Sequence, residues 1–551
     1  MKRILLFSLL LSFGNISISQ WYETDILKES EPTSGGNVGS GVDISGEWAI
    51  VGAGENDEYG VNAGAIIFYK NVDGEWVEMQ KLVAEEVEAG DYFGRYVGID
   101  NHIAVAGSVC DGDFGDCSGA TYVFELGDDG VWIETAKLMA SDADAEDGFG
   151  MDVAIHGEQI IVGAPFNQDA GVRSGSAYIY EKTDGEWVET AKLVSADLDE
   201  EDWFGFSVDI EGDRAAVGAW LEGDEAYYGA AYLFEKTEGV WEEVAKIIPS
   251  ELTGSFSIDI ALDANHLAVG AADAVFVYDL SGAEVEEMVM LTASSEFADG
   301  FGTSIALDNN RLIVADAADD MSGTNAGAGY VFVLEDDVWV EKTMFFPSDP
   351  AIGTGFGEFR NIAIDNDYIF AGATGYDEWL PEIGGVYVYE YCAITPEISS
   401  AVSLESFGAD GAIDLTVTGG VPDYTFDWDI DEAGDFDDDE DLADLSAGTY
   451  TVVVSDEVGC ETTETIVVDS QVGIDELSEV VNVYPNPATS NLTIELEGVY
   501  TYSIYNLSGA LVQQGQGNDT ETVNISELPA GAYILQLLSN NQTLQLHLIK
   551  Q

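Results

Sequence analysis

The feature that most constrains the fold is a sequence unit of about 55 residues that recurs through the first part of the chain. Each copy contains a strand-like run that begins with Trp, any residue, and Glu, as in Trp76-Val77-Glu78. Clear copies start at Trp76, Trp132, Trp187, Trp241 and Trp339. A degenerate copy starts at Val285 with Glu287, and Trp21-Tyr22-Glu23 supplies one more. Repetition at a steady period indicates a chain built from stacked copies of one unit.

A Phe-Gly pair follows each of these runs by roughly a dozen residues. It stands at Phe93-Gly94, Phe149-Gly150, Phe204-Gly205, Phe301-Gly302 and Phe356-Gly357, with weaker copies at Val38-Gly39 and Phe256-Ser257. Two short apolar runs and a closing run such as Gly175–Tyr180 complete the unit. Four short strands in a unit of this length are typical of one blade of a β-propeller.

The two ends of the repeat region complement each other. The last unit, Ile362–Tyr391, lacks its Trp-x-Glu strand, and Trp21–Leu27 is the missing piece. Joining the two closes the ring without a covalent bond and removes open sheet edges. The sequence therefore predicts a seven-bladed β-propeller over residues 20–391.

The markers Phe149-Gly150 and Gly163-Ala164-Pro165 resemble FG-GAP repeats, which are similar to the propeller of integrin α-subunits. The resemblance implies a propeller, and integrin-type blades often carry an Asp-x-Asp-x-Asp-Gly calcium loop. The nearest forms here lack the Gly at the sixth place, and they involve Asp142, Asp144, Asp147, Asp197, Asp199 and Asp202. These residues are candidate Ca²⁺ ligands. The alternative is that the Asp two residues before each Phe (Asp91, Asp147, Asp202 and Asp299) accepts backbone N–H bonds in a turn, and this use is the commoner one.

Residues 392–470 form a different segment with alternating strands at Ile413–Val417 and Tyr450–Val454. The runs Pro422–Trp428, Leu445–Tyr450 and Gly459-Cys460 resemble the SprB-type repeat of bacterial surface adhesins, which implies a small β-sandwich. An acidic stretch separates the strands and offers oxygens that suit Ca²⁺. The candidate ligands are Asp429, Asp431, Asp435, Asp437 and Asp439. The alternative is a solvated acidic loop.

A polar linker covers residues 471–483, and residues 484–551 resemble a type A C-terminal sorting domain of type IX secretion. The matching residues are Val483–Pro487, Tyr502–Asn506, Leu528–Tyr533 and Leu548–Lys550. This resemblance implies a second small sandwich that an outer-membrane secretion machine reads. The expected fold class is therefore all-β, with a seven-bladed propeller followed by two small β-sandwich (Ig-like) domains.

The N-terminus has the pattern of a secretory signal. Lys2 and Arg3 precede the apolar run Ile4–Phe13, which is too short to span a bilayer. We place signal cleavage after Ser19, so that residues 1–19 lead to the periplasm and the C-terminal domain leads outward to the medium or the cell surface. No later segment is apolar enough for a membrane-spanning helix, and we expect a monomer.

Charge excludes one class of partner. The chain has 17 basic and 105 acidic residues, a net charge of −88, so it repels nucleic acid and anionic membranes. The four cysteines of an exported chain predict disulfides. Cys110 and Cys117 lie close in one loop, and a Cys392–Cys460 bridge closes a long one.

No catalytic constellation stands out. His102, His156 and His266 are expected at solvent-facing turns, and there is no Gly-x-Ser-x-Gly elbow. The recurrent Trp is expected to pack between blades. Its Glu is expected to face outward and to pair with the Lys three residues on, at Lys81, Lys137, Lys192 and Lys246.

The function that these features favour is binding or adhesion to an extracellular protein or glycan. The most variable loops are the expected contact surface, and they are Asp111–Asp116, Phe166–Arg173, Trp220–Tyr228 and Asp316–Asn325. Trp220, Tyr227, Tyr228 and Trp379 are candidate stacking residues. The alternatives are an extracellular hydrolase that acts on polysaccharide or protein, and a calcium-stiffened structural component of the surface.

Overall fold

The computed structural model describes most of the chain between residue 21 and residue 551. The described residues are 21–30, 32, 35–221, 229–250, 254–282, 284–295, 297–348, 355–358, 360–375, 383–392, 396–403, 410–420, 422–428, 438–456, 460–469, 481–539 and 542–551. The predicted signal, most of the linker and most of the acidic stretch lie outside them.

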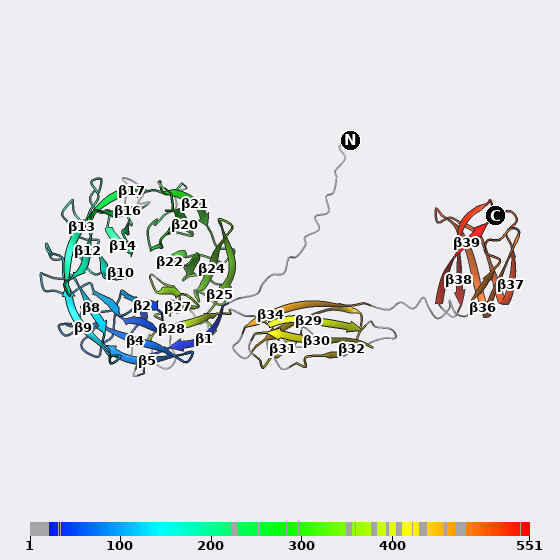
Figure 1. Cartoon of the computed structure of the whole chain (residues 1–551), viewed down its shortest axis with the longest axis horizontal. Coiled ribbons are helices and arrows are strands. Elements are labelled where there is room, and N and C mark those ends of the chain that lie inside the picture. The colour runs from blue at the N-terminus through cyan, green and yellow to red at the C-terminus, as the bar shows by residue number, and fades with distance from the viewer. Residues whose placement is uncertain are drawn as a thin grey trace. The chain divides into compact units, whose positions relative to one another are not determined.

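Every regular element within the described ranges is a β-strand, and seven four-stranded antiparallel sheets form the ring in Figure 1. We call these sheets blades and give each from its innermost to its outermost strand. Blades 1 to 4 are β2 (Val38–Ser45), β3 (Trp48–Ala53), β4 (Ala65–Val72), β5 (Glu75–Leu82); β6 (Val97–Asp100), β7 (Ile103–Ser108), β8 (Ala120–Leu126), β9 (Trp132–Leu138); β10 (Asp152–His156), β11 (Gln159–Ala164), β12 (Ser176–Thr183), β13 (Glu186–Leu193); and β14 (Phe204–Glu211), β15 (Arg214–Ala219), β16 (Ala230–Thr237), β17 (Val240–Ile247). Blades 5 to 7 are β18 (Ile260–Leu262), β19 (His266–Ala271), β20 (Ala274–Asp279), β21 (Glu286–Leu291); β22 (Phe301–Asp308), β23 (Arg311–Asp316), β24 (Ala328–Glu335), β25 (Val338–Phe345); and β26 (Ile362–Asp365), β27 (Tyr368–Ala373), β28 (Gly385–Tyr391), β1 (Trp21–Leu27).

The innermost strands bring neighbouring blades together. β2 contacts β6, and the same contact continues through β10, β14, β18, β22 and β26 back to β2. The second strand of each blade is covered on both faces by the adjoining blades, so it is an almost continuous run of small and apolar residues, as in β3 and β7.

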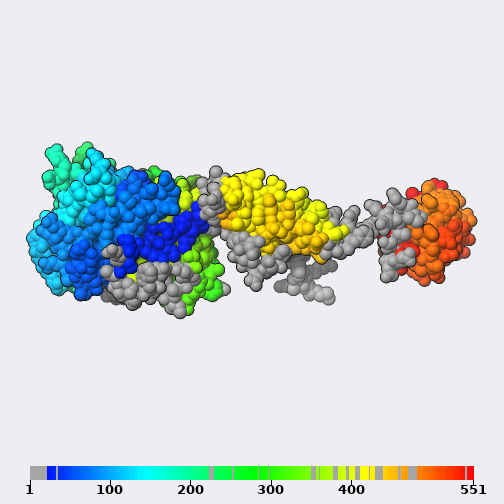
Figure 2. All heavy atoms as spheres, turned by 90° about the horizontal axis from the view of Figure 1, so that it is seen from below, coloured from blue at the N-terminus to red at the C-terminus, as the bar shows by residue number. Residues whose placement is uncertain are grey.

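The first strand of the chain belongs to the last blade. β1 pairs antiparallel with β28, with Trp21 opposite Tyr391 and Leu27 opposite Val386. The prediction that Trp21–Leu27 supplies the missing strand of the last unit is confirmed. Figure 2 shows the atoms of this segment in dark blue against the green of the last blades. β1 contacts β28 of its own blade and β25 of the preceding blade.

The recurrent Trp packs between blades, as the sequence predicts. The ring of Trp132 in blade 2 stacks on Phe68 of blade 1 at 4.3 Å between centroids, and Trp76 of blade 1 meets Phe370 of blade 7 at 4.9 Å. Stacked and edge-on aromatic pairs stabilise such contacts by about 0.5–1.5 kcal/mol beyond the area they bury.

The predicted pairing of Glu and Lys within each outer strand is wrong. The Glu of most motifs instead accepts hydrogen bonds from a Ser that follows the outer strand of the preceding blade. These pairs are Glu23–Ser348, Glu78–Ser30, Glu189–Ser141, Glu287–Ser250 and Glu341–Ser294. The Lys side chains reach acidic residues in the loops, because the Glu is already engaged across the joint.

Two smaller β regions follow the propeller. The middle region has two three-stranded sheets around a shared core that includes Ile413, Trp428 and Val452. Its strands are β29 (Pro396–Ser403), β30 (Gly411–Gly419), β32 (Leu442–Leu445) in one sheet and β31 (Thr425–Trp428), β33 (Gly448–Ser455), β34 (Glu461–Val468) in the other. A disulfide joins Cys392, directly after β28, to Cys460, directly before β34, as predicted.

The C-terminal region has five strands linked through one long strand. They are β35 (Asn482–Tyr484), β36 (Asn491–Asn506), β37 (Leu511–Asn524), β38 (Gly531–Ser539) and β39 (Gln542–Lys550). Leu492, Ile504, Leu535 and Leu548 are among the residues of its core. The part of the chain that the structure describes contains no helix with the length and apolarity to cross a membrane.

Candidate binding face of the propeller

One face of the ring carries the variable loops. In each blade the strands alternate in direction, so the connections between second and third strands share a face with the connections between blades. We call this the loop face. The described parts of all four variable loops, including Asp111–Asp116 and Phe166–Arg173, are connections between second and third strands.

Hydrogen bonds join several of the described loops to the connections between blades, and we call the joined loops the rim. The backbone N–H of Tyr92, between blades 1 and 2, donates to the carbonyl of Asn62 in a blade 1 loop at 3.0 Å. The N–H of Glu201, between blades 3 and 4, donates to Val172 at 2.8 Å. Loops tied in this way present their side chains in fixed positions.

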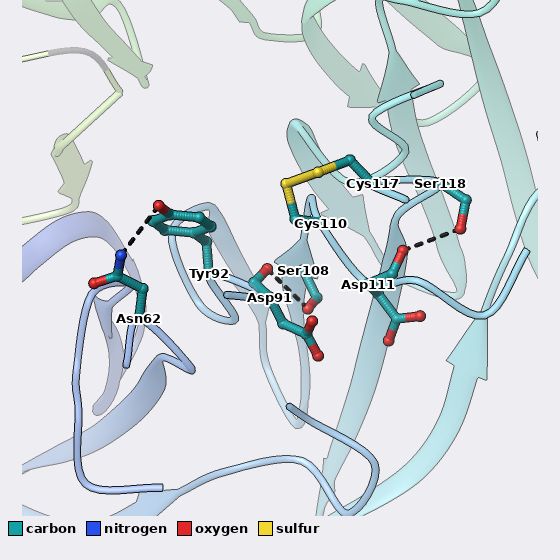
Figure 3. The surroundings of a disulfide bond; sticks show 8 residues. All are labelled: Asn62, Asp91, Tyr92, Ser108, Cys110, Asp111, Cys117 and Ser118. Atoms are coloured by element: carbon teal, nitrogen blue, oxygen red, sulfur yellow. Dashed lines mark hydrogen bonds between the residues drawn. A yellow bond between two sulfur atoms is a disulfide. The ribbon is translucent and has the colours of Figure 1, made fainter. Parts of the chain in front are cut away.

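The loop of blade 2 has a further constraint, shown in Figure 3. The Cys110–Cys117 disulfide closes it, and the Ser118 hydroxyl donates to the carbonyl of Asp111 at 3.0 Å. Beside it, the Ser108 hydroxyl donates to the carbonyl of Asp91 at 3.2 Å. The prediction of disulfides is confirmed for all four cysteines.

An aromatic cluster lies on the loop face where blades 3 and 4 meet. Trp203 is 5.0 Å from Phe166 and 5.6 Å from Trp220, and Trp220 stacks on Phe206 at 4.7 Å with 20° between the ring planes. Phe166, Trp203 and Trp220 are partly exposed, whereas Phe206 is buried. The cluster therefore offers ring surface to solvent above a packed base.

Arginines extend this cluster in both directions. The Arg173 guanidinium lies 5.7 Å from the Phe166 ring centre, and Arg360 lies 4.7 Å from Phe206 and 5.5 Å from Tyr96. Arg95 in turn lies 5.9 Å from Tyr96. We call the rings of Tyr96, Phe166, Trp203, Phe206 and Trp220, with exposed Arg95 and Arg173 at the two ends, the aromatic strip.

Trp203 has an unfavourable backbone conformation. Its φ is +58°, in the left-handed region, and the residues at the same place in other blades, among them Tyr92, Gly148 and Gly355, also have a positive φ. The repeat turn therefore imposes this conformation, and a bulky residue that adopts it costs of order 1–3 kcal/mol.

Arg360 fills the centre of the ring beneath the strip. It comes from the connection into blade 7. Three residues separate Gly357 from Asn361 there, whereas one residue separates Gly94 from Tyr96 at the corresponding place in blade 2. Its guanidinium donates to the carbonyl of Met151 at 3.1 Å and to that of Phe206. Its Nε lies 3.6 Å from Asp152 and 3.8 Å from Asp259, both of which are buried.

The carboxylates that face the channel also have a structural use. At each joint, an Asp of one blade accepts a backbone N–H from the next blade. These pairs are Asp43–Ile99, Asp100–Gly157, Asp152–Val208, Asp209–Leu262, Asp259–Ile305, Asp308–Asn366 and Asp365–Gly46. Burial raises the pKa of Asp43 and of Asp259 to about 7. The backbone N–H groups, and Arg360 in the case of Asp259, act to lower the pKa but do not outweigh burial.

Most candidate Ca²⁺ ligands of the propeller contact lysine or backbone N–H groups. Lys192 lies 2.6 Å from Asp142, which also accepts from Tyr178, and Lys246 lies 2.6 Å from Asp197. Asp147 and Asp202 accept backbone N–H bonds from Asp144 and Asp199, as the turn interpretation predicts.

Within the described residues, no group of three or more His, Cys, Asp or Glu side chains is arranged to hold a metal ion. Asp429, Asp431, Asp435 and Asp437 lie outside the described residues. The carbonyl of Asp439 accepts a bond from the Trp428 indole at 3.1 Å. Calcium binding stays a prediction, which melting curves with calcium and with chelator test.

The expectation that all three propeller histidines face solvent is wrong for His266. His266 is buried at the start of β19, contacts the carboxylate of Asp263 at 3.2 Å, and packs edge-on against Trp339 at 5.6 Å. The ring of Trp339 and the carboxylate of Asp263 therefore cover its side chain. His102 and His156 are exposed or partly exposed.

Sequence reasoning identified only part of the aromatic strip. It selected Trp220, whereas Tyr227, Tyr228 and Trp379 lie outside the described residues. It missed Phe166 as a stacking residue, and it missed Trp203 and Arg360 entirely. The sequence does contain a signal for the tryptophans, because both depart from the repeat. Trp203 occupies the position that Gly148 has in blade 3, and Trp220 occupies the position that Gly54 has in blade 1.

Comparisons with known proteins agree with two of the resemblances. The FG-GAP repeat model matches residues 76–124, 132–180, 187–234 and 285–332, each from the outer strand of one blade to the third strand of the next. The secretion system C-terminal sorting domain model matches residues 482–551. The chain thus carries FG-GAP repeats and a type IX sorting domain, and it is exported to the cell surface or the extracellular space.

No curated protein matches the chain. Among solved structures, it is similar to a functionally unknown protein from Desulfotomaculum acetoxidans DSM 771. The two are 12% identical, the match covers 58% of this chain and 89% of that chain, and the TM-score is 0.37. The SprB-type and Ig-like descriptions of the smaller regions stay predictions.

Proposed function

We propose that this exported protein is an adhesion protein whose propeller binds an extracellular glycan through the aromatic strip. The observation that carries the proposal is the set of partly exposed rings of Phe166, Trp203 and Trp220, held on a hydrogen-bonded rim. Such rings offer large contact area with little loss of side-chain entropy.

Charge and hydrogen-bonding groups favour this ligand class. Glu201 accepts from the Trp203 indole at 3.3 Å and lies 3.8 Å from Arg173, so polar groups border the rings as sugar hydroxyls require. The net charge of −88 disfavours polyanions, which points to a neutral glycan. An extracellular protein is the alternative ligand.

We also propose that the protein is not an enzyme. Acid/base hydrolysis of glycosides needs two carboxyl groups that reach the substrate. Asp152 and Asp259 are buried and Asp43 is partly buried, and all three are engaged with backbone N–H groups or Arg360, which supports a structural role for the channel.

A glycan array and a pull-down from the extracellular medium, both with the full mature chain, test the proposal. The double variant Trp203→Ala, Trp220→Ala should lose at least tenfold in affinity for any glycan that the wild type binds, since buried aromatic contacts dominate such interfaces. Ile133→Ala, which changes an exposed residue on the outer strand of blade 2, should retain it. Equal binding by all three proteins contradicts the proposal, and a protein captured instead of a glycan selects the alternative ligand.

A further inference from the structure

The outer side of each joint between blades has a slot for one aromatic ring. The Trp that opens the outer strand of one blade packs against the second strand of the blade before it. Trp132 lies 5.6 Å from Trp48 of β3, and Trp339 lies 5.6 Å from His266 of β19. Trp21, Trp76, Trp187 and Trp241 supply the ring at four further joints.

The joint between blades 4 and 5 lacks this ring. Glu287 pairs with Tyr278 as Glu78 pairs with Tyr69, so the register places Val285 where blade 1 has Trp76. Val285 packs only at the margin of the local core. A side chain without an indole therefore stands where the repeat provides one.

A cavity of about 520 Å³ lies at this joint. Its lining includes Arg214 and Leu233 of blade 4 and Tyr278, Leu280 and Val285 of blade 5. Leu233 corresponds in register to Phe68, on which Trp132 stacks in blade 2. The volume is within the range of ordinary ligand sites, roughly 300–1,000 Å³.

Arg214 borders the slot with its guanidinium fixed in place. It donates to the carboxylate of Glu235 at 2.9 Å and to the carbonyls of Ala264 at 2.9 Å and Leu280 at 3.1 Å. Arg311 begins β23 as Arg214 begins β15, and its guanidinium lies 5.8 Å from the ring of Trp21. An aromatic ring in the slot would find the same cationic neighbour.

The cavity at the joint of blades 6 and 7 provides a contrast. It measures about 410 Å³, but Trp21 forms part of its wall and Asn309, Asn310 and Lys342 line it with polar groups. Polar and charged side chains, including Glu235, Lys246 and Glu287, line the blade 4–5 slot as well, and the partly exposed Val244 and Ile248 stand among them. The difference between the two cavities is therefore the indole, which Trp21 supplies at one joint and Val285 does not supply at the other.

We infer that the slot between blades 4 and 5 binds an aromatic side chain of a partner protein, which takes the place of the tryptophan that Val285 replaces. The site is separate from the aromatic strip on the loop face. The outermost strand β21 leaves one edge open in the described sheet, so the partner segment can lie beside it in extended form.

Calorimetric titration of the full mature chain with N-acetyl-tryptophanamide, and with the same residue inside a short extended Val-Trp-Val peptide, tests the inference. The amide should bind at one site, and the peptide should bind at least tenfold more tightly. Val285→Trp should abolish binding of both and raise the melting temperature by a few degrees, because the slot is filled from within. Ile133→Trp adds an exposed indole at another outer strand and should change neither property.

Trp339→Val provides the reverse test, because it empties the corresponding slot between blades 5 and 6 and should add a second site for the amide. Retained binding by Val285→Trp, no binding by the wild type, or equal affinity for amide and peptide contradicts the inference. A Val285→Trp chain that does not fold also contradicts it, because the slot then has no room for the ring. Trp203→Ala, Trp220→Ala should keep amide binding, so failure of the glycan proposal leaves this result unaffected.

Discussion

The channel and the loop face of the propeller both carry acidic side chains, but the pKa of these side chains is shifted in opposite directions in the two regions. Burial raises the pKa of Asp43 and Asp259 in the channel to about 7. On the loop face, the pKa of Asp142 and of Asp197 is lowered. Partial burial acts to raise it, but the hydrogen bonds from Lys192 and Lys246 have the larger effect.

Arginine differs between the two regions in the same way. Arg360 in the channel is 8% exposed and lies between two buried carboxylates, whereas the side chain of Arg173 on the loop face is 48% exposed. A buried charge is costly once its partner is removed, and an exposed one is not. We conclude that the channel charges hold the blades together and that Arg173 on the loop face is left exposed, as the proposed binding role requires.

The largest expected effect comes from removing the channel cation. Arg360→Met should lower the free energy of unfolding by about 3–5 kcal/mol, because it leaves Asp152 and Asp259 buried without their counter-charge. Denaturant titration measures this. Arg173→Met, the matched change on the loop face, should cost under about 1 kcal/mol. Equal costs for the two variants would remove the distinction between the regions.

The pH dependence of stability should separate the regions next. A carboxyl group whose pKa is about 7 when folded and near 3.9 when unfolded holds its proton longer in the folded state. Asp43 and Asp259 therefore make the free energy of unfolding fall as pH rises from about 4 to about 7, by up to about 1.4 kcal/mol per pH unit for each group.

Asp43→Asn should make the fall in the free energy of unfolding with pH less steep, by the contribution of at most one bound proton. Denaturant titration between pH 4 and pH 8 measures this. Asp142 and Asp197 act in the opposite sense, because their stabilisation is present above about pH 4 and is lost on further acidification. A slope that is the same in Asp43→Asn and the wild type would show that Asp43 is ionised throughout.

The smallest effect belongs to the loop-face lysines. Lys192 contacts Asp142 and Asp169, whose side chains are 38% and 60% exposed. Lys192→Met should lower the free energy of unfolding by about 0.5–1 kcal/mol at low salt, and the difference should shrink in about 1 M NaCl. A loss of several kcal/mol that salt does not change would place this pair with the channel charges.

The repeated strands and turns of the fold were predictable from the sequence, whereas most side-chain contacts between blades were not. The closing strand Trp21–Leu27, the packing of Trp132 and the turn role of Asp147 follow from positions that recur in each unit. Repetition gives such positions the same surroundings each time, so one interpretation serves all copies.

Most polar contacts between blades escaped the sequence analysis, because each joins side chains from two blades that lie far apart along the chain. Glu189 bonds to Ser141 of the preceding blade rather than to Lys192 in its own strand. Arg360 contacts Met151 and Phe206, which lie far from it in sequence. The aromatic strip likewise combines Phe166, Trp203 and Trp220 from three separate connections, and each is an exception to the repeat.

The most direct test of this division measures binding and stability together in two variants, Asp43→Asn for the channel and Trp203→Ala, Trp220→Ala for the loop face. Each is profiled on the same glycan array as the wild type and melted in the same buffer. The account predicts that the channel variant melts at a different temperature but keeps the wild-type binding profile, and that the loop-face variant loses that profile while it remains folded. A channel variant that loses glycan binding while still folded, or a loop-face variant that keeps it, would contradict the account.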